Sequence, residues 1–134
     1  MVQAFDSAFA ERFGEQSKTM KILDAGAGTG MVGEELLKLG YTNIDALDYC
    51  QEMLDVAKEK KIYKKLIRAA LCEEPVTEIS TGEYDGVISS GTFTVGAARA
   101  VGLREVVRHI KSGKYVPLHF YILCKWHNKT VVIG

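Results

Sequence analysis

A short apolar strand that runs directly into a glycine-rich loop constrains the fold of this chain more than any other feature. Residues 22–30 read ILDAGAGTG, with glycines at 26, 28 and 30. Glycine permits positive φ and a close approach of the backbone to a ligand. A helix that begins near Gly30 points free N–H groups into the crevice at the strand ends. The segment therefore predicts an α/β fold with a binding site at this turn.

Strand and helix patterns alternate along the rest of the chain. Short β-type runs alternate with helical apolar patterns at the spacing of βαβ units, which favours a parallel sheet with right-handed crossovers. We expect a single domain over residues 1–134, an α/β Rossmann-like parallel sheet with helices on both faces. The predicted strands are 21–25, 43–48, 66–71 and 84–90, with a fifth after 112–113, and the predicted helices are 31–39, 51–61 and 101–110.

The N-terminal segment predicts one further helix. Phe5, Phe9 and Phe13 recur every four residues, and Gly14 follows the last of them. Such a stripe is typical of a helix that packs on the core. A lid over a ligand is the alternative interpretation.

Two acidic residues end the first two strands. Asp24 lies just before the glycine loop and Asp48 ends the second strand. Adjacent parallel strands are about 4.8 Å apart, so both carboxylates should lie at the same rim of the sheet. A ligand with a cationic amino group and a ribose diol, such as S-adenosylmethionine, would suit them, with Asp24 at the amino end and Asp48 on the ribose. Either acid could instead be a helix cap or a turn former.

A nicotinamide-dependent dehydrogenase is the nearest enzymatic alternative. Residues 28–33 satisfy the dinucleotide pattern G-x-G-x-x-G, and Asp48 could hold a ribose there too. Asp24 would repel a diphosphate, however. The chain also offers no Tyr-x-x-x-Lys arrangement for hydride transfer, because Tyr84 and Tyr115 lack a lysine four residues on. The methyl-donor interpretation is therefore favoured.

The same segments carry a family resemblance. The loop DAGAGTG, ALDY at the second strand and EYDGVISSGT at the fourth resemble class I S-adenosylmethionine-dependent methyltransferases. More narrowly, ILDAGAGTGMVGEELLKLGY, EMLDVAKEKKIYKKLI and GTFTVG resemble the methyltransferase-like proteins of the Williams–Beuren chromosomal region. The resemblance extends over residues 22–115 and implies S-adenosylmethionine as the cofactor and methyl transfer as the activity.

The resemblance also implies a role for individual positions. The methionine end of the cofactor would lie on the loop, the ribose on Asp48, the adenine near the second and third strand ends, and the sulfonium beside the fourth strand. The residues implied are Asp24, Gly26, Ala27, Gly28 and Gly30 for the loop, Tyr49, Met53, Ala70 and Leu71 for the adenine, and Ser89 with Ser90 for the sulfonium.

The chain departs from the family pattern in several places. Ala70 stands where an acidic residue is common, and Ala97 where a histidine is frequent. Residues 116–134 are unlike the family, and Pro117 would interrupt a central strand. We therefore expect a truncated or alternatively spliced product, or a mispredicted gene end, that lacks the C-terminal closing hairpin and could self-associate through an open sheet edge. A catalytically silent cofactor-binding or partner subunit is the second functional hypothesis.

The catalytic chemistry leaves little trace in the sequence. Methyl transfer from an activated sulfonium mainly requires alignment of the acceptor, so no catalytic residue is named. Ser89-Ser90-Gly91-Thr92 replaces the Asn-Pro-Pro-Tyr type of motif expected for base or amide nitrogens. His109 reads as a surface or capping residue. Cys124 and His127 supply only half of a zinc-site spacing, so no metal is expected.

Composition limits the possible partners and compartment. The formal net charge is +0, which gives no electrostatic reason to expect nucleic acid or a membrane surface. The three cysteines are widely spaced and do not form a disulfide framework, and no apolar run is long enough to span a bilayer. We expect a cytoplasmic enzyme that acts on a small-molecule acceptor.

Overall fold

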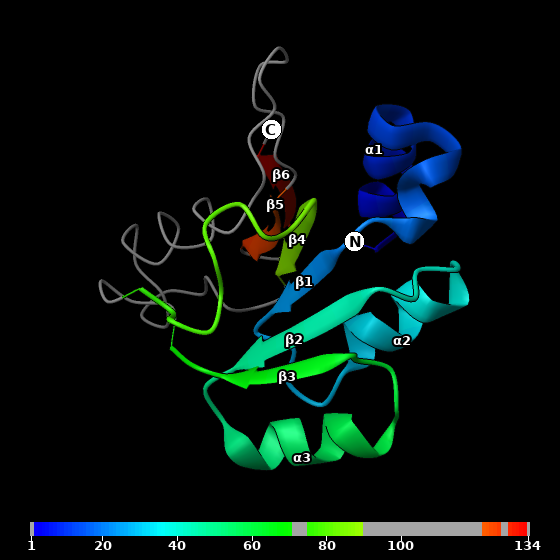
Figure 1. Cartoon of the computed structure of the whole chain (residues 1–134). Coiled ribbons are helices and arrows are strands. Elements are labelled where there is room, and N and C mark those ends of the chain that lie inside the picture. Colours follow the sequence, from blue (N-terminus) through cyan, green and yellow to red (C-terminus); the bar gives the residue numbers. More distant parts are fainter. Residues whose placement is uncertain (1, 71–74, 90–121, 127–128, 134) are drawn as a thin grey trace.

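The computed structural model describes residues 2–70, 75–89, 122–126 and 129–133, of which residues 4, 12, 122–126 and 129–133 are described by their backbone alone. Strands and helices alternate from the N-terminus, as predicted (Figure 1). The helices are α1 (Val2–Phe13), the short 3-10 helix η1 (Gly14–Thr19), α2 (Met31–Lys38) and α3 (Gln51–Glu59). The strands are β1 (Ile22–Ala25), β2 (Ile44–Asp48), β3 (Lys65–Arg68), β4 (Gly86–Ser89), β5 (Ile122–Trp126) and β6 (Lys129–Ile133).

The strands form one sheet in the order β3-β2-β1-β4-β5-β6. Strand β1 lies between β2 and β4 and pairs with both in parallel, with Ile22 opposite Ile44 on one side and Gly86 on the other. Every residue of β1 and β4 is buried, the pattern of a strand covered on both faces. The predicted Rossmann-like parallel sheet is thus confirmed.

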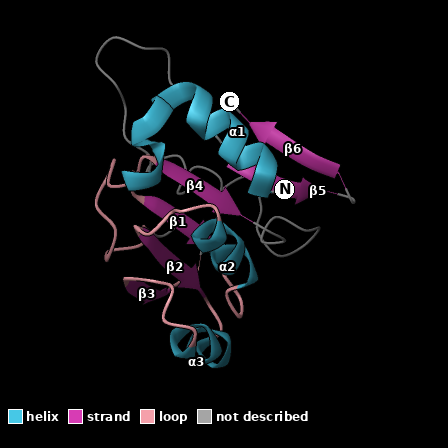
Figure 2. Cartoon of the chain, turned by 90° about the vertical axis from the view of Figure 1, so that its right-hand side faces the viewer, coloured by secondary structure: helices cyan, strands magenta, loops and turns pink. Residues whose placement is uncertain are grey.

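Helices α1, α2 and α3 pack on one face of the sheet. Figure 2 shows α1 and α2 in front of the strands. Alternation along the strands directs Ile22, Ile44 and Ile88 into the cluster that also contains Leu36 of α2. On the same face, Leu54 of α3 packs against Ala46, two residues beyond Ile44 on β2. The helix predicted at 101–110 lies outside the described residues.

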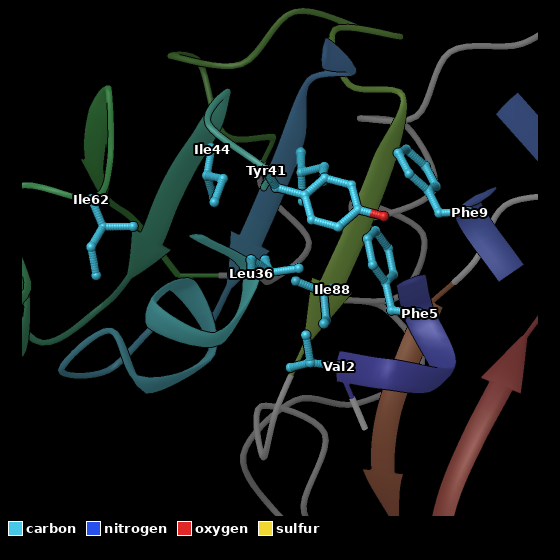
Figure 3. Close-up of a cluster of buried hydrophobic side chains, with 9 residues drawn as sticks. Val2, Phe5, Phe9, Leu36, Tyr41, Ile44, Ile62 and Ile88 are labelled. Atoms are coloured by element: carbon cyan, nitrogen blue, oxygen red, sulfur yellow. The ribbon is translucent and has the colours of Figure 1, made fainter. Parts of the chain in front are cut away.

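Helix α1 is part of this core. Phe5 and Phe9 are fully buried and stack with their ring centroids 4.9 Å apart. Figure 3 shows both rings between α1 and the strands, beside Tyr41 and Ile88. A Cβ on Gly86 would lie 2.7 Å from the Phe9 ring, so the absence of a side chain there lets α1 approach β4. The prediction of a core helix is confirmed, and the lid interpretation is wrong for these two rings.

A polar network holds the other end of the sheet, at the start of β1. The backbone N–H of Lys21 donates to a carboxylate oxygen of Asp85 over 2.8 Å, and its ammonium lies 2.9 Å from Glu83. The buried Asp45 accepts a 2.8 Å hydrogen bond from the hydroxyl of Tyr84. Because these groups bring β1, β2 and the approach to β4 together, the buried polar groups here have a structural role.

Two strands form the C-terminal edge of the sheet. Strand β5 continues the sheet in parallel beside β4, and β6 then pairs with β5 in antiparallel register, with Ile122 opposite Ile133. Strand β6 is thus the outer strand at this end of the sheet, and the lack of the family's closing hairpin stays a prediction. Pro117 and Ala97 lie outside the described residues, and truncation and self-association stay predictions. No described helix has the length and apolar character needed to cross a membrane.

Candidate functional site

The glycine loop turns sharply from β1 into α2. Gly26, Gly28 and Gly30 all have positive φ, at 77°, 57° and 94°. The backbone N–H groups of Gly26 and Ala27 both donate to the carbonyl of Leu47, over 2.7 and 3.0 Å, which folds the loop across the end of β2. L-residues rarely adopt such φ values, so the loop needs glycine at these three positions.

The surroundings of the loop glycines differ. A Cβ added to Gly28 would meet no described atom within 4 Å, whereas one on Gly30 would lie 3.3 Å from the ring of Tyr63. Gly33, in the first turn of α2, is tighter still, because its Cβ would lie 2.3 Å from the Tyr63 hydroxyl. Gly28 therefore faces open space, and Gly33 makes room for a tyrosine.

Asp48 ends β2 and supports the loop directly. One carboxylate oxygen accepts the backbone N–H of Gly28 over 2.7 Å, and the other accepts that of Cys50 over 2.9 Å. A carboxylate offers about four acceptor positions, so capacity remains for a ligand hydroxyl pair. The structure thus brings the predicted ribose acid to the predicted glycine loop, where it also fixes the loop conformation.

Asp24 is completely buried beneath the loop. Its Oδ2 accepts a 2.6 Å hydrogen bond from the hydroxyl of Tyr63, and its Oδ1 has no hydrogen-bond partner among the described residues. The pKa of Asp24 is raised to about 7, chiefly by burial; the hydrogen bond from Tyr63 lowers it, and the charge of Asp48 adds to the rise. In the described part of the chain, no lysine, arginine or histidine forms an ion pair with either acid. Among the residues described, neither acid of the site therefore has a cationic partner.

Ser89 is the second buried residue with an unsatisfied oxygen. It ends β4 opposite Ala25, immediately before the loop on β1. Its side chain is fully buried, and its Oγ has no partner among the described residues. Buried polar groups in native proteins are nearly always satisfied, by ordered water or a ligand if not by protein. Asp24 and Ser89 lie on opposite faces of the sheet by strand alternation, but both are near the C-terminal ends of neighbouring strands, where open α/β sheets bind ligands.

The residues predicted at the adenine end lie on the surface. Tyr49 and Met53 are 69% and 44% exposed, which leaves apolar area uncovered. The guanidinium of Arg68 lies 5.9 Å from the centre of the Tyr49 ring, and its Nε donates to the Tyr49 carbonyl over 3.2 Å. Ala70 is exposed at the end of β3. Leu71 and Ser90 lie outside the described residues, as do His109 and His127, and no described group of side chains could hold a metal.

Tyr63 is the site residue that sequence reasoning missed. It precedes β3 and reaches across to Asp24, past Gly30 and Gly33. The one available signal was Gly33, the last glycine of the G-x-G-x-x-G pattern. We read that glycine as a dinucleotide signature, whereas in the structure it accommodates Tyr63.

Comparisons with known proteins agree with this geometry. The family described as a methyltransferase domain matches residues 22–113. The chain is 32% identical over 111 residues to malonyl-[acyl-carrier protein] O-methyltransferase of Bacillus cereus, covering 82% of this chain and 40% of that protein. It is also 32% identical over 85 residues to methyltransferase-like protein 27 of Homo sapiens, covering 63% and 34%. The chain thus spans less than half the length of these curated relatives.

Solved structures share the fold. A putative S-adenosyl-L-methionine-dependent methyltransferase from Methanococcus maripaludis superposes with a TM-score of 0.65 at 22% identity, covering 92% of this chain and 54% of that one. A sugar N-methyltransferase from Streptoalloteichus gives a TM-score of 0.68 at 16% identity, covering 92% and 46%. These likenesses establish the architecture, and the family match gives no support to the dehydrogenase alternative.

Proposed function

Because this chain belongs to the methyltransferase domain family, we propose that it binds S-adenosylmethionine and transfers the methyl group to a small-molecule acceptor. The observation that carries the proposal is the buried carboxylate of Asp24, whose Oδ1 has no hydrogen-bond partner among the described residues, at the base of an open glycine loop. The length of the curated relatives shows that they contain more chain than is present here. Methyl transfer by this chain is therefore proposed rather than carried over from these longer relatives.

The described residues fit this cofactor at each of its ends. The free Oδ1 of Asp24 would accept the cationic amino group, a charge-assisted bond that supplies the missing counter-charge. The spare acceptor positions of Asp48 would take the ribose hydroxyls. The open space over Gly28 would admit the methionine moiety close to the backbone. Tyr49 and Met53 would cover a face of the adenine with exposed apolar surface.

The chemistry asks for positioning more than for acid–base groups. The cofactor supplies a methyl group already activated by the sulfonium, and the protein must align the acceptor for in-line attack. Ser89 ends β4 at the crevice, where its unpartnered hydroxyl could bind a polar group of either ligand. We name no general base. The net charge of +0 and the widely spaced cysteines support a small-molecule acceptor and a cytoplasmic location.

Calorimetric titration with S-adenosylmethionine and with its demethylated product tests the proposal. Asp48→Ala should weaken binding tenfold or more, about 1.4 kcal/mol, since it removes both the ribose acceptor and the support of Gly28. Asp55→Ala, which removes an exposed carboxylate from α3, should bind like the wild type. A folded wild-type chain that binds neither compound would refute the proposal. Binding without turnover over a panel of acceptors would favour the silent cofactor-binding subunit instead.

A further inference from the structure

The placement of Tyr63 has a functional explanation beyond packing. Its hydroxyl donates to Oδ2 of Asp24 over 2.6 Å, while Oδ1 of the same carboxylate stays unpartnered among the described residues. Burial and the neighbouring charge of Asp24 raise the pKa of the Tyr63 hydroxyl, so it stays protonated and remains a donor. One oxygen of Asp24 is thus occupied by protein, and the other is available.

The surrounding backbone is shaped around this tyrosine. A side chain on Gly33 would collide with the hydroxyl and the ring, at 2.3 and 2.6 Å from Cβ, and one on Gly30 would press on the ring edge. The hydroxyl therefore has little freedom to turn away from Asp24. Such confinement is what a positioning residue requires, because a ligand-binding carboxylate must be held within a fraction of an ångström.

We propose that Tyr63 is a positioning residue, which fixes the Asp24 carboxylate by its Oδ2 so that Oδ1 alone receives the amino group of S-adenosylmethionine. This inference rests on the proposed function. It also assigns Gly33 as the residue whose lack of a side chain makes the arrangement possible. Tyr63 itself touches neither the transferred methyl group nor the acceptor in this scheme.

The local charges favour a cationic ligand at Oδ1. Asp48 acts on Asp24 from the end of β2, and Glu34 acts on Tyr63 from α2. Both are carboxylates, and within the described residues no cation offsets them at Asp24. An ammonium group placed at Oδ1 would therefore be attracted by Asp24 and Asp48 together. A neutral donor would gain only a hydrogen bond to Oδ1, and an anionic group would be repelled by both carboxylates.

Tyr63→Phe is the decisive variant, because it removes the hydroxyl and keeps the ring. The matched control is Tyr84→Phe, which removes an equivalent 2.8 Å bond from a buried tyrosine to the buried Asp45 on the other face of the sheet. Tyr63→Phe should weaken S-adenosylmethionine binding about tenfold at pH 7, because Asp24 would be less ionised and no longer held in place to receive the amino group. Tyr84→Phe should leave the affinity within about twofold of the wild type.

The pH profile separates positioning from simple stability. Without the Tyr63 bond the pKa of Asp24 should rise, so the affinity ratio of wild type to Tyr63→Phe should be larger at pH 7 than at pH 9. The titration of the ligand's own amino group cancels in this ratio. In the ligand-free protein, the ¹³C carboxyl resonance of Asp24, assigned with Asp24→Asn, should titrate at higher pH in Tyr63→Phe than in the wild type. It should be unchanged in Tyr84→Phe.

The possible failures are distinguishable. If the wild type binds S-adenosylmethionine and Tyr63→Phe matches it in both affinity and Asp24 titration, the inference about Tyr63 is overturned and the proposed function stands. If the folded wild type binds no S-adenosylmethionine, the proposed function itself fails, and this inference fails with it. Equal weakening by Tyr63→Phe and Tyr84→Phe, without a pH-dependent ratio, would reduce Tyr63 to a structural role and overturn the inference.

Discussion

Replacement of Asp24 by asparagine should increase stability at neutral and alkaline pH. The pKa of this carboxyl is raised from 3.8 to about 7, chiefly by burial. Below about pH 4 the carboxyl is protonated in both the native and the unfolded states, and its burial carries no ionisation cost. As the pH rises towards 7 the free energy of unfolding falls, because the unfolded state ionises this acid readily and the native state does not. Above pH 7 the cost levels off near 4 kcal/mol, at about 1.4 kcal/mol for each pKa unit.

Asparagine avoids this cost without changing the shape of the side chain. Its amide oxygen can still accept the hydrogen bond from Tyr63, whereas its NH₂ would occupy the position of the unpartnered Oδ1. That buried donor adds a penalty that does not change with pH. The informative quantity is therefore the difference between Asp24→Asn and wild type as a function of pH. It should grow by about 2–3 kcal/mol between pH 5 and pH 8.

Urea denaturation followed by circular dichroism at pH 5, 6, 7 and 8 measures this difference. Asp55→Asn, on the exposed side of α3, is the control and should parallel the wild type at every pH. A difference between Asp24→Asn and wild type that stays constant across the series would refute the reasoning. It would mean that Asp24 ionises near its ordinary pKa despite complete burial. The same variant should bind S-adenosylmethionine more weakly, so stability and binding should change in opposite directions.

Three other substitutions test the loop and the core. Gly28→Ala should lower the free energy of unfolding by only about 1–2 kcal/mol, since a φ of 57° strains alanine but no described atom crowds its Cβ. It should nevertheless abolish S-adenosylmethionine binding in calorimetry. Retained binding would contradict a cofactor that lies over this residue. Gly86→Ala should lower the free energy of unfolding by about 1–3 kcal/mol, seen as a lower urea midpoint, because the new Cβ would lie 2.7 Å from the Phe9 ring. An unchanged midpoint would show that α1 shifts away from β4 at little energetic cost. Tyr84→Phe should lower the free energy of unfolding by about 1–3 kcal/mol, because Asp45 loses the hydrogen bond from the tyrosine hydroxyl. An unchanged free energy of unfolding would mean that water replaces this donor.

Local patterns predicted the centre of the fold well. The apolar runs around Ile22, Ile44 and Val87 became the buried strands β1, β2 and β4, because a strand covered on both faces needs little beyond such a run. The loop glycines were predictable for the same local reason, since positive φ is a property of single residues. The acids at the strand ends followed from the rule that parallel strands end at one rim.

Contacts between distant segments could not be predicted in this way. Tyr63 meets Asp24 only because the chain returns from α3 to β3 beside the glycine loop, and no spacing in the sequence records that approach. The hydrogen bond from Gly28 to Asp48 likewise depends on how the loop folds over β2. The antiparallel pairing of β5 with β6 lies in a segment unlike the family, where the pattern predicted a fifth strand but gave neither its bounds nor its antiparallel partner.

The central position of β1 also determines when the core can fold during translation. Its neighbour β4 and the contact from Lys21 to Asp85 lie 64 residues downstream. At about 5–20 residues per second, the ribosome needs about 3–13 s to supply them. During that interval the nascent chain carries the aromatic face of α1 with no β4 to cover it, because Phe5 and Phe9 pack over Gly86. Full burial of this aromatic face therefore waits until translation has passed β4.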